Sequence, residues 1–301
     1  MTDIMKDTRR TFLATAGAAA GGLAFAGPAS AFLNTETLLG VGAAAVQGFT
    51  MGEGHEIQIG EQYYEQYLLQ SGGRYPDRNA QEALKRFAAP LIATSDREKL
   101  PWDIALVGND QVNAWALPGG KMAINSALVQ VADDPNELAS VIAHEIGHAE
   151  LAHGLSQMRN QTFMSAASTV AKTAVLSQLG AAAPLGAEAL AALEGPIFQL
   201  ITAGYSRSNE FEADQHILHV FGKTGMDPDR ADDFFHTLQA VYPRGSNETT
   251  SLFSTHPVTS ERITAIEKTA AGMGGHGRSS ALPGWAELKA IFPTPERFRK
   301  G

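Results

Sequence analysis

The segment His144-Glu145-Ile146-Gly147-His148 has the residue types and the spacing of a hydrolytic metal site. It lies in an apolar, alanine-rich run that predicts a helix, and residues four apart on a helix share one face. His144 and His148 can therefore offer two imidazoles to one ion, while Glu145 can reach a water molecule beside that ion. Two neutral nitrogens and a nearby carboxylate are what a catalytic zinc site requires from one helix. The alternative is a pair of solvated histidines on a surface helix.

A second acidic segment supplies a candidate third ligand. A catalytic zinc ion takes three protein ligands and keeps one position open, and this chain has no cysteine to offer. The best candidate is Glu210, in a predicted helix over 206–222. Asp214 follows one turn later on the same face, where it can accept a hydrogen bond from the far nitrogen of a ligating histidine. Glu212 is interpreted as solvated, and the alternative for Glu210 is an exposed acidic helix face.

These two segments, His144–His148 and Ser206–Asp214, resemble the two signature motifs of the M48 metallopeptidases. Three further segments resemble the same family in order and spacing: Glu56–Gly60, Asn113–Gly120 and Ser254–Arg262. The resemblance covers roughly residues 53–268. It therefore implies a zincin-like fold of the gluzincin type and hydrolysis of peptide bonds.

The resemblance also implies roles for the metal-binding residues and the general base, and the chemistry of hydrolysis suggests one for His256. One Zn²⁺ ion is expected on His144, His148 and Glu210, with Glu145 as the general base that takes a proton from water and delivers it to the leaving amine. His256 is expected either to contact the oxyanion or to occupy the open zinc position at rest; the alternative is a histidine that caps the last helix. The other histidines are interpreted as surface or structural residues: His55, His153, His216, His219, His236 and His276.

Hydrophobic periodicity predicts a predominantly helical α+β fold. Three short strands are expected over 102–107, 112–117 and 121–125, as a small antiparallel sheet beside the active-site helix at 136–153. Amphipathic helices are expected over 53–70, 79–94, 230–242 and 259–269. Such a sheet offers an edge strand that a peptide could join, and the alternative is a purely structural hairpin.

The segment 163–204 lies between the two ligand-bearing helices and is almost uncharged. A membrane span is disfavoured, because its longest charge-free run, 173–187, is shorter than the roughly 20 residues that a span needs. Two buried or interfacial helices are expected instead. They could form a lid over the cleft, a contact with a membrane surface, or part of the core.

The N-terminal residues predict export. Arg9 and Arg10 precede a modestly apolar segment, and small residues end at Ala31, which is typical of a twin-arginine signal peptide over 1–31. The expected organisation is then a linker over 32–52, a metallopeptidase domain over 53–270 and a tail over 271–301. The expected location is the periplasm or the cell envelope.

Composition limits the remaining function classes. With 44% hydrophobic and 18% charged residues, the 301-residue chain is expected to be globular. Its net charge of −9 argues against nucleic acid as a partner. The favoured function is zinc-dependent cleavage of misfolded or unassembled envelope proteins, with any membrane association peripheral. Two alternatives stay open: a chaperone-like binding protein with a structural zinc, and a membrane-embedded protease.

Overall fold

The computed structural model describes residues 51–168, 187–243, 251–277 and 282–298. The expected signal peptide over 1–31 and nearly all of the linker over 32–52 lie outside these ranges. In the described residues, helices and strands follow one another in the order α3 (Glu53–Gln70), α4 (Arg78–Ile92), β1 (Asp103–Val107), β2 (Ala114–Leu117), β3 (Lys121–Asn125), α5 (Ser126–Val131), α6 (Pro135–Glu150), α7 (His153–Ser168), α8 (Ala187–Ala203), α9 (Arg207–Thr224), η5 (Pro228–Arg230), α10 (Asp233–Val241), α11 (Ser251–Thr255), α12 (Ser260–Ala270), α13 (Trp285–Ile291) and η6 (Glu296–Phe298). The predicted α+β architecture, predominantly helical with one small sheet, is confirmed.

The sheet differs from the prediction in one pairing. Its strand order is β1-β3-β2, in which β2 pairs with β3 antiparallel but β1 pairs with β3 parallel. The expectation of a wholly antiparallel sheet was therefore wrong. The chain reverses once between β1 and β2 and again at the turn Pro118-Gly119-Gly120, so β1 and β3 run in the same direction. Because β3 takes the central position, the two strands that run alike become neighbours.

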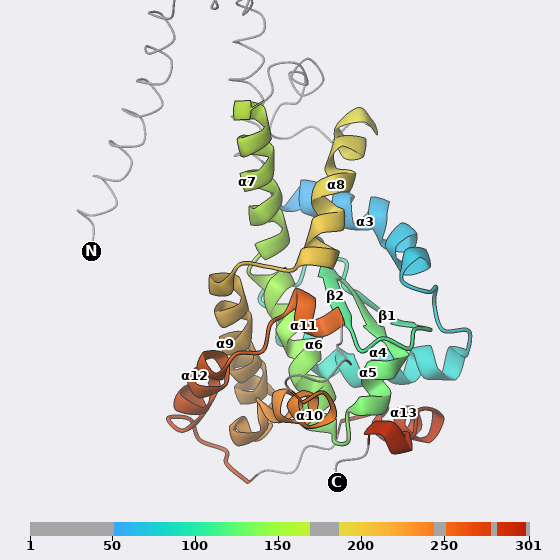
Figure 1. Cartoon of the computed structure of the whole chain (residues 1–301), viewed down its shortest axis with the longest axis vertical. Helices are drawn as coiled ribbons and strands as arrows, with labels where there is room; N and C mark the ends of the chain where they lie inside the picture. Colours follow the sequence, from blue (N-terminus) through green and yellow to red (C-terminus); the bar gives the residue numbers. More distant parts are fainter. Residues whose placement is uncertain (1–50, 169–186, 244–250, 278–281, 299–301) are drawn as a thin grey trace, which may run out of the picture.

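The sheet is covered on both faces, which explains why its strands are almost entirely buried. One face carries Leu106 and Ile124 and packs into a core shared with α4, α6, α9 and α10. The opposite face carries Val107 and Trp115 and packs against α3, α7 and α8. Successive residues of a strand point to opposite faces, so the two hydrophobic clusters alternate along each strand. Figure 1 shows the sheet between these two groups of helices, with α6 running through the centre of the molecule.

Helix α6 packs along α9, the second ligand-bearing helix, and also contacts β2. The two helices come close together at Gly147. A Cβ atom there would lie 2.9 Å from the Cβ of His216 and 3.1 Å from the Cα of Ala213 on α9. A side chain at this position would push the helices apart. The glycine inside the motif therefore sets the distance across which Glu210 must reach.

The segment 163–204 is described only in part, since 169–186 lie outside the described ranges. Helices α7 and α8 leave the sheet side by side, and α8 also contacts β2 and α11. Two α8 side chains, Leu193 and Ile197, are buried against the sheet. Within the described part of the chain, no helix is long and apolar enough to cross a membrane. Whether the whole segment forms a lid stays a prediction.

Residues beyond 271, expected as a tail, include a docked element. Helix α13 packs against α4 and α5, and Leu288 is fully buried there. The side chains of Phe292 and Phe298 join the same core. Described residues 282–298 thus belong to the folded body that supports the site.

Candidate metal centre

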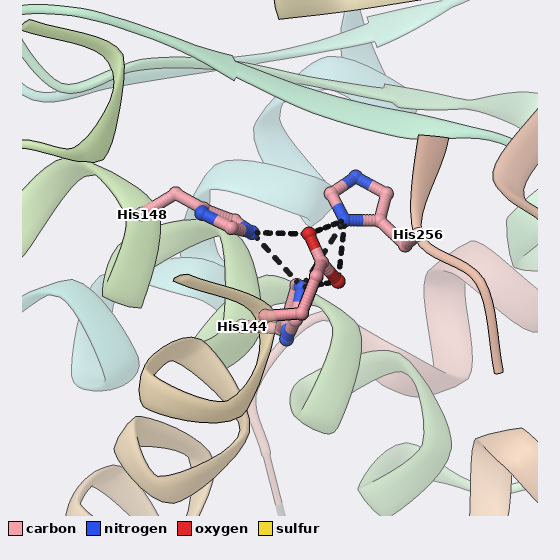
Figure 2. A group of neighbouring side chains, drawn as sticks. His144, His148 and His256 are labelled. Atoms are coloured by element: carbon pink, nitrogen blue, oxygen red, sulfur yellow. Dashed lines mark hydrogen bonds and ion pairs between the residues drawn. The ribbon is translucent and has the colours of Figure 1, made fainter. Parts of the chain in front are cut away.

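Helix α6 places His144, Glu145 and His148 at the centre of the molecule. Its N-terminus is fixed by Asp134, whose carboxylate accepts a hydrogen bond from the backbone N–H of Asn136 at 2.8 Å. One helical turn separates the two histidines, and their Nε2 atoms lie 3.0 Å apart. All three side chains of the motif are buried. The i, i+4 spacing therefore does bring both imidazoles to one point (Figure 2).

Helix α9 brings Glu210 to the same point. Its carboxylate oxygens lie 3.4 Å from Nε2 of His144 and 3.4 Å from Nε2 of His148. Ser206 caps this helix by accepting a hydrogen bond from Asn209 N–H at 3.3 Å, so Glu210 stands in the first turn. Burial alone would raise the pKa of Glu210, but the surrounding histidines hold it well below its usual range. The side chain is therefore an ionised carboxylate that faces two imidazoles.

His256 completes the cluster from a different part of the chain. Its Nδ1 lies 3.1 and 3.2 Å from the two Glu210 oxygens and 3.2 Å from Nε2 of His144. It stands just after α11, on the side opposite His148 (Figure 2). Ligand atoms of His144, His148, Glu210 and His256 all lie within 4.8 Å of one another, and all four residues are buried.

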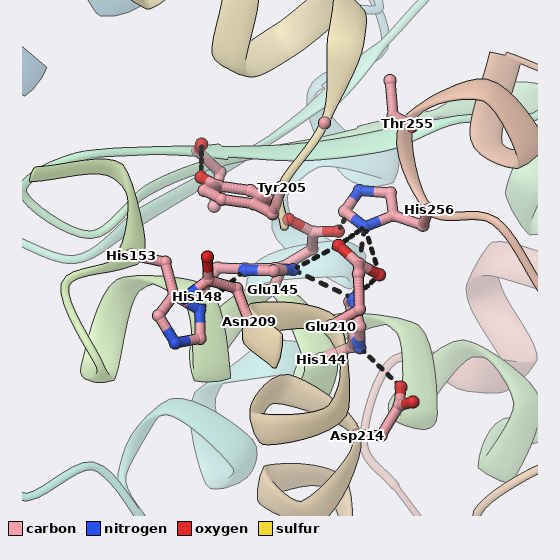
Figure 3. A network of polar contacts seen from close by, with 12 residues as sticks. His144, Glu145, His148, His153, Tyr205, Asn209, Glu210, Asp214, Thr255 and His256 are labelled. Carbon is pink, nitrogen blue, oxygen red and sulfur yellow. Dashed lines mark hydrogen bonds and ion pairs between the residues drawn. The ribbon is translucent and has the colours of Figure 1, made fainter. Parts of the chain in front are cut away.

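Asp214 and Arg262 support the cluster from behind. Asp214 Oδ1 lies 3.1 Å from Nδ1 of His144, the ring atom that faces away from the cluster (Figure 3). Arg262 donates to both oxygens of Asp214 at 2.6 Å, and its Nη1 lies 2.9 Å from Glu210. Against the effect of burial, Arg262 and His144 lower the pKa of Asp214. The carboxylate is therefore ionised and oriented to hold the His144 ring.

The geometry of the four groups fits a tetrahedral metal ion. Ligand atoms about 2.0–2.1 Å from a tetrahedral zinc lie roughly 3.4 Å from one another, close to the separations of 3.0–3.4 Å seen here. Burial alone would lower the pKa of His144, but Asp214 and Glu210 raise it to about 9. The two carboxylates therefore favour a positive charge at His144. The donor set is that of a zinc site without cysteine.

Glu145 is the reactive group that stands beside the cluster and not within it. It is buried, and neither of its carboxylate oxygens has a hydrogen-bond partner among the described residues. Burial raises the pKa of this carboxyl group, which makes it a stronger base once ionised. Nε2 of His256 lies 3.5 Å from Glu145 Oε1. An uncommitted buried carboxylate at this point is suited to accept a proton from water.

Three residues near His148 were missed by the sequence analysis. His153, interpreted there as surface or structural, is buried with its Nδ1 2.9 Å from Nδ1 of His148. Glu212 is largely exposed, as expected of a solvated residue, yet it also accepts a hydrogen bond from His153 at 2.9 Å. Tyr205 stacks on the His148 ring with 3.9 Å between ring centroids and 14° between planes. Helical periodicity gave no signal for His153, because residues five apart on one helix do not share a face.

Comparison with known proteins places this geometry in a family context. A model of peptidase family M48 matches residues 78–270. The chain is 30% identical over 238 residues to the beta-barrel assembly-enhancing protease of Escherichia coli K12, covering 76% of this chain and 46% of that protein. It is 33% identical over 156 residues to metalloprotease YcaL of the same organism, covering 52% and 57%. It is also 27% identical over 181 residues to the mitochondrial metalloendopeptidase OMA1 of Arabidopsis thaliana, covering 60% and 34%. The chain spans about half the length, or less, of these curated relatives.

Proposed function

Because this chain belongs to peptidase family M48, we propose that it is a zinc-dependent endopeptidase that cleaves unfolded or unassembled polypeptides of the cell envelope. One observation carries the proposal: Glu145 is buried, has no hydrogen-bond partner among the described residues, and lies beside the four converging groups that fit a zinc ion. A structural zinc site needs no base beside it, so a buried carboxylate at this point favours a catalytic site. The substrate class is supported by the name of the beta-barrel assembly-enhancing protease, to which the chain is similar.

His144, His148 and Glu210 would hold the ion. A bound zinc supplies a Lewis acid that polarises the scissile carbonyl and makes water more acidic. Glu145 accepts the proton that the attacking water loses, then transfers it to the leaving amine. Asp214 keeps His144 Nε2 directed at the ion by holding Nδ1, and Arg262 keeps Asp214 in place.

His256 is proposed to occupy the fourth position in the resting protein. Its Nδ1 faces the cluster at 3.1–3.2 Å from the Glu210 oxygens, close enough to act as a ligand and to exclude water from that position. A substrate would then have to displace this ring. His256→Ala is expected to bind zinc and to cleave unfolded substrate faster than wild type. If cleavage slows while zinc content stays normal, His256 acts on the oxyanion and does not block the site.

Glu145→Gln tests the enzymatic proposal. The amide cannot take up the proton, so cleavage of an unfolded polypeptide such as casein should fall by about 10²–10⁴-fold while zinc content stays at one ion per chain. The matched control is Glu82→Gln, because Glu82 is an exposed glutamate on α4, far along the chain from the motif. Glu210→Ala should lose most of its zinc. A wild-type protein that binds zinc but cleaves no polypeptide would support the chaperone-like alternative instead.

Export through the twin-arginine route is proposed from the sequence alone, since residues 1–31 lie outside the described residues. A double Arg9→Lys, Arg10→Lys variant is expected to accumulate in the cytoplasm as precursor. Unchanged delivery of the mature protein to the envelope would refute this route.

A further inference from the structure

We propose that His153 and Glu212 form a relay that fixes the tautomer and the orientation of His148, so that both are positioning residues of the metal centre. The inference rests on the proposed function only in taking His148 as a zinc ligand. It deepens that function by assigning the second imidazole its own support, separate from the pair Asp214 and Arg262 that holds His144.

The contacts form one continuous chain from the surface to the cluster. Glu212 Oε2 lies 2.9 Å from His153 Nε2, and His153 Nδ1 lies 2.9 Å from His148 Nδ1. His148 Nε2 in turn faces Glu210 and His144. His153 is 3% exposed, whereas 60% of the Glu212 side chain is exposed. The relay therefore begins at a solvated carboxylate on α9, passes through a buried imidazole at the start of α7 and ends at α6. Figure 3 shows the His153 ring beside His148.

Only one arrangement of protons satisfies this chain when His148 binds a metal. The ligating nitrogen, Nε2, must carry a free lone pair, so a neutral His148 holds its proton on Nδ1. That proton is donated to His153 Nδ1, which must be unprotonated to accept it. A neutral His153 then holds its own proton on Nε2 and donates it to Glu212. Each hydrogen bond thus fixes the tautomer of the next ring. Glu212 therefore determines the tautomer of His148 through His153, without contacting His148 itself.

Packing restricts the remaining freedom of the His148 ring. Tyr205 covers one face of it at 3.9 Å, and the Tyr205 hydroxyl donates to the carbonyl of Ala116 on β2 at 3.4 Å. Stacking fixes the plane of the ring but permits a half-turn flip about the Cβ–Cγ bond, which would place a ring carbon where Nε2 faces the cluster. The hydrogen bond to His153 supplies this second constraint. Stacking and relay are therefore complementary.

The backbone is shaped to place His153 in this position. Ala152, between α6 and α7, has φ of +51°, and it is the only non-glycine residue with positive φ in the described ranges. An L-residue in this region is strained, and such strain is commonly kept at functional positions. The chain bends at Ala152, so α6 ends before it and α7 begins at His153. The bend directs the His153 side chain back towards His148 on α6. A continuous helix would have carried His153 to a different face from His148.

Zinc affinity, measured by chelator competition, tests the relay without depending on catalysis. His153→Leu removes the acceptor and should weaken affinity about 10–100-fold. His153→Gln should recover most of the loss, because its carbonyl oxygen can accept from His148 and its amide can donate to Glu212. Glu212→Ala, a surface change that should not impair folding, is expected to weaken affinity by about 10-fold, with Glu82→Ala as the matched control. Thermal unfolding of the metal-free proteins checks that each variant is folded.

A double-mutant cycle separates the relay from a simple charge effect. If Glu212 acts through His153, adding Glu212→Ala to His153→Leu should cause no further loss of zinc affinity. Equal losses in both backgrounds would show that Glu212 acts only by its charge, and would overturn the relay. Unchanged affinity in His153→Leu would overturn it as well. If the wild-type protein binds no zinc, or if His148→Ala binds it with normal affinity, the proposed zinc site fails together with the relay. If the wild-type protein binds zinc and the His153 and Glu212 variants bind it with the same affinity, only the relay is refuted.

Discussion

Arg262 and Asp214 form a buried, bidentate ion pair directly behind the metal-binding cluster. Two guanidinium nitrogens of Arg262 each lie 2.6 Å from a different oxygen of Asp214, and both residues are at most 2% exposed. The third nitrogen donates to the carbonyl of Pro257 at 2.9 Å and lies 2.9 Å from Glu210. One side chain from α12 thus joins the helix of Glu210 and Asp214 to the segment that carries His256.

Replacing Arg262 should destabilise the protein strongly even without metal. Arg262→Met keeps the length of the side chain but leaves two buried carboxylates without their cation, so the free energy of unfolding should fall by about 3–5 kcal/mol. Arg262→Lys should be intermediate, because an ammonium cannot donate in the planar bidentate geometry. Denaturant unfolding of the metal-free proteins measures both values. A loss below about 1 kcal/mol for Arg262→Met would mean that the carboxylates find other partners.

Removing Asp214 should weaken zinc binding through His144. Asp214→Asn keeps the size of the side chain but loses the charge, and zinc affinity should fall roughly 10–100-fold. Asp214→Ala should do the same and also destabilise the fold, because it leaves the Arg262 guanidinium buried without its main partner. Affinity and unfolding should be measured on the same preparations. Wild-type affinity in the asparagine variant would remove Asp214 from the support of His144.

The sequence alone predicts which residues share one face of a helix. It does not predict which residues of different helices contact each other. His144 and His148, like Glu210 and Asp214, are four residues apart, so the geometry of a helix alone aligns them. The partner of Asp214, Arg262, lies on another helix, and no local pattern indicates which carboxylate it meets.

Two features that local sequence patterns did not indicate share a physical cause. His153 reaches His148 only because the chain breaks at Ala152, where no glycine, proline or asparagine marks a helix end. In the sheet, the hydrophobic pattern identified β1, β2 and β3. Their order, with β3 in the centre, depends on how the strands pack together with the surrounding helices. Neither the break nor the strand order is encoded by a local motif.

His216 should make the metal-free protein sensitive to mild acid. Burial, followed by the charges of His219 and Lys223, lowers the pKa of His216 from 6.5 to about 4. Between pH 6.5 and pH 4 the unfolded chain therefore binds the proton more readily than the folded protein does. Stability should fall as pH drops through this window, by up to about 3 kcal/mol, and this contribution should level off below pH 4.

His216→Phe isolates this contribution, because phenylalanine keeps the planar ring but cannot take up a proton. The Nε2 atom of His216 is buried without a hydrogen-bond partner among the described residues, so its loss should cost little at pH 7. Unfolding free energies of the two metal-free proteins should therefore diverge as the pH falls from 6.5 to 4, with the variant more stable. Parallel curves over that range would show that His216 does not titrate as its surroundings indicate.

Ala152 should tolerate only residues that accept a left-handed backbone. Its φ of +51° costs an L-residue about 1–2 kcal/mol, whereas glycine adopts it freely but gains about 0.5–1 kcal/mol of unfolded-state entropy. Ala152→Gly should therefore be neutral or slightly stabilising. Ala152→Val should be clearly destabilising, because a β-branched residue is rarely found at positive φ.

Since Ala152 directs the side chain of His153 towards His148, the valine variant should also bind zinc more weakly, and the glycine variant should bind it normally. Thermal unfolding and chelator competition test the two effects separately. If valine lowers stability but leaves zinc affinity unchanged, the bend serves the fold and not the placement of His153.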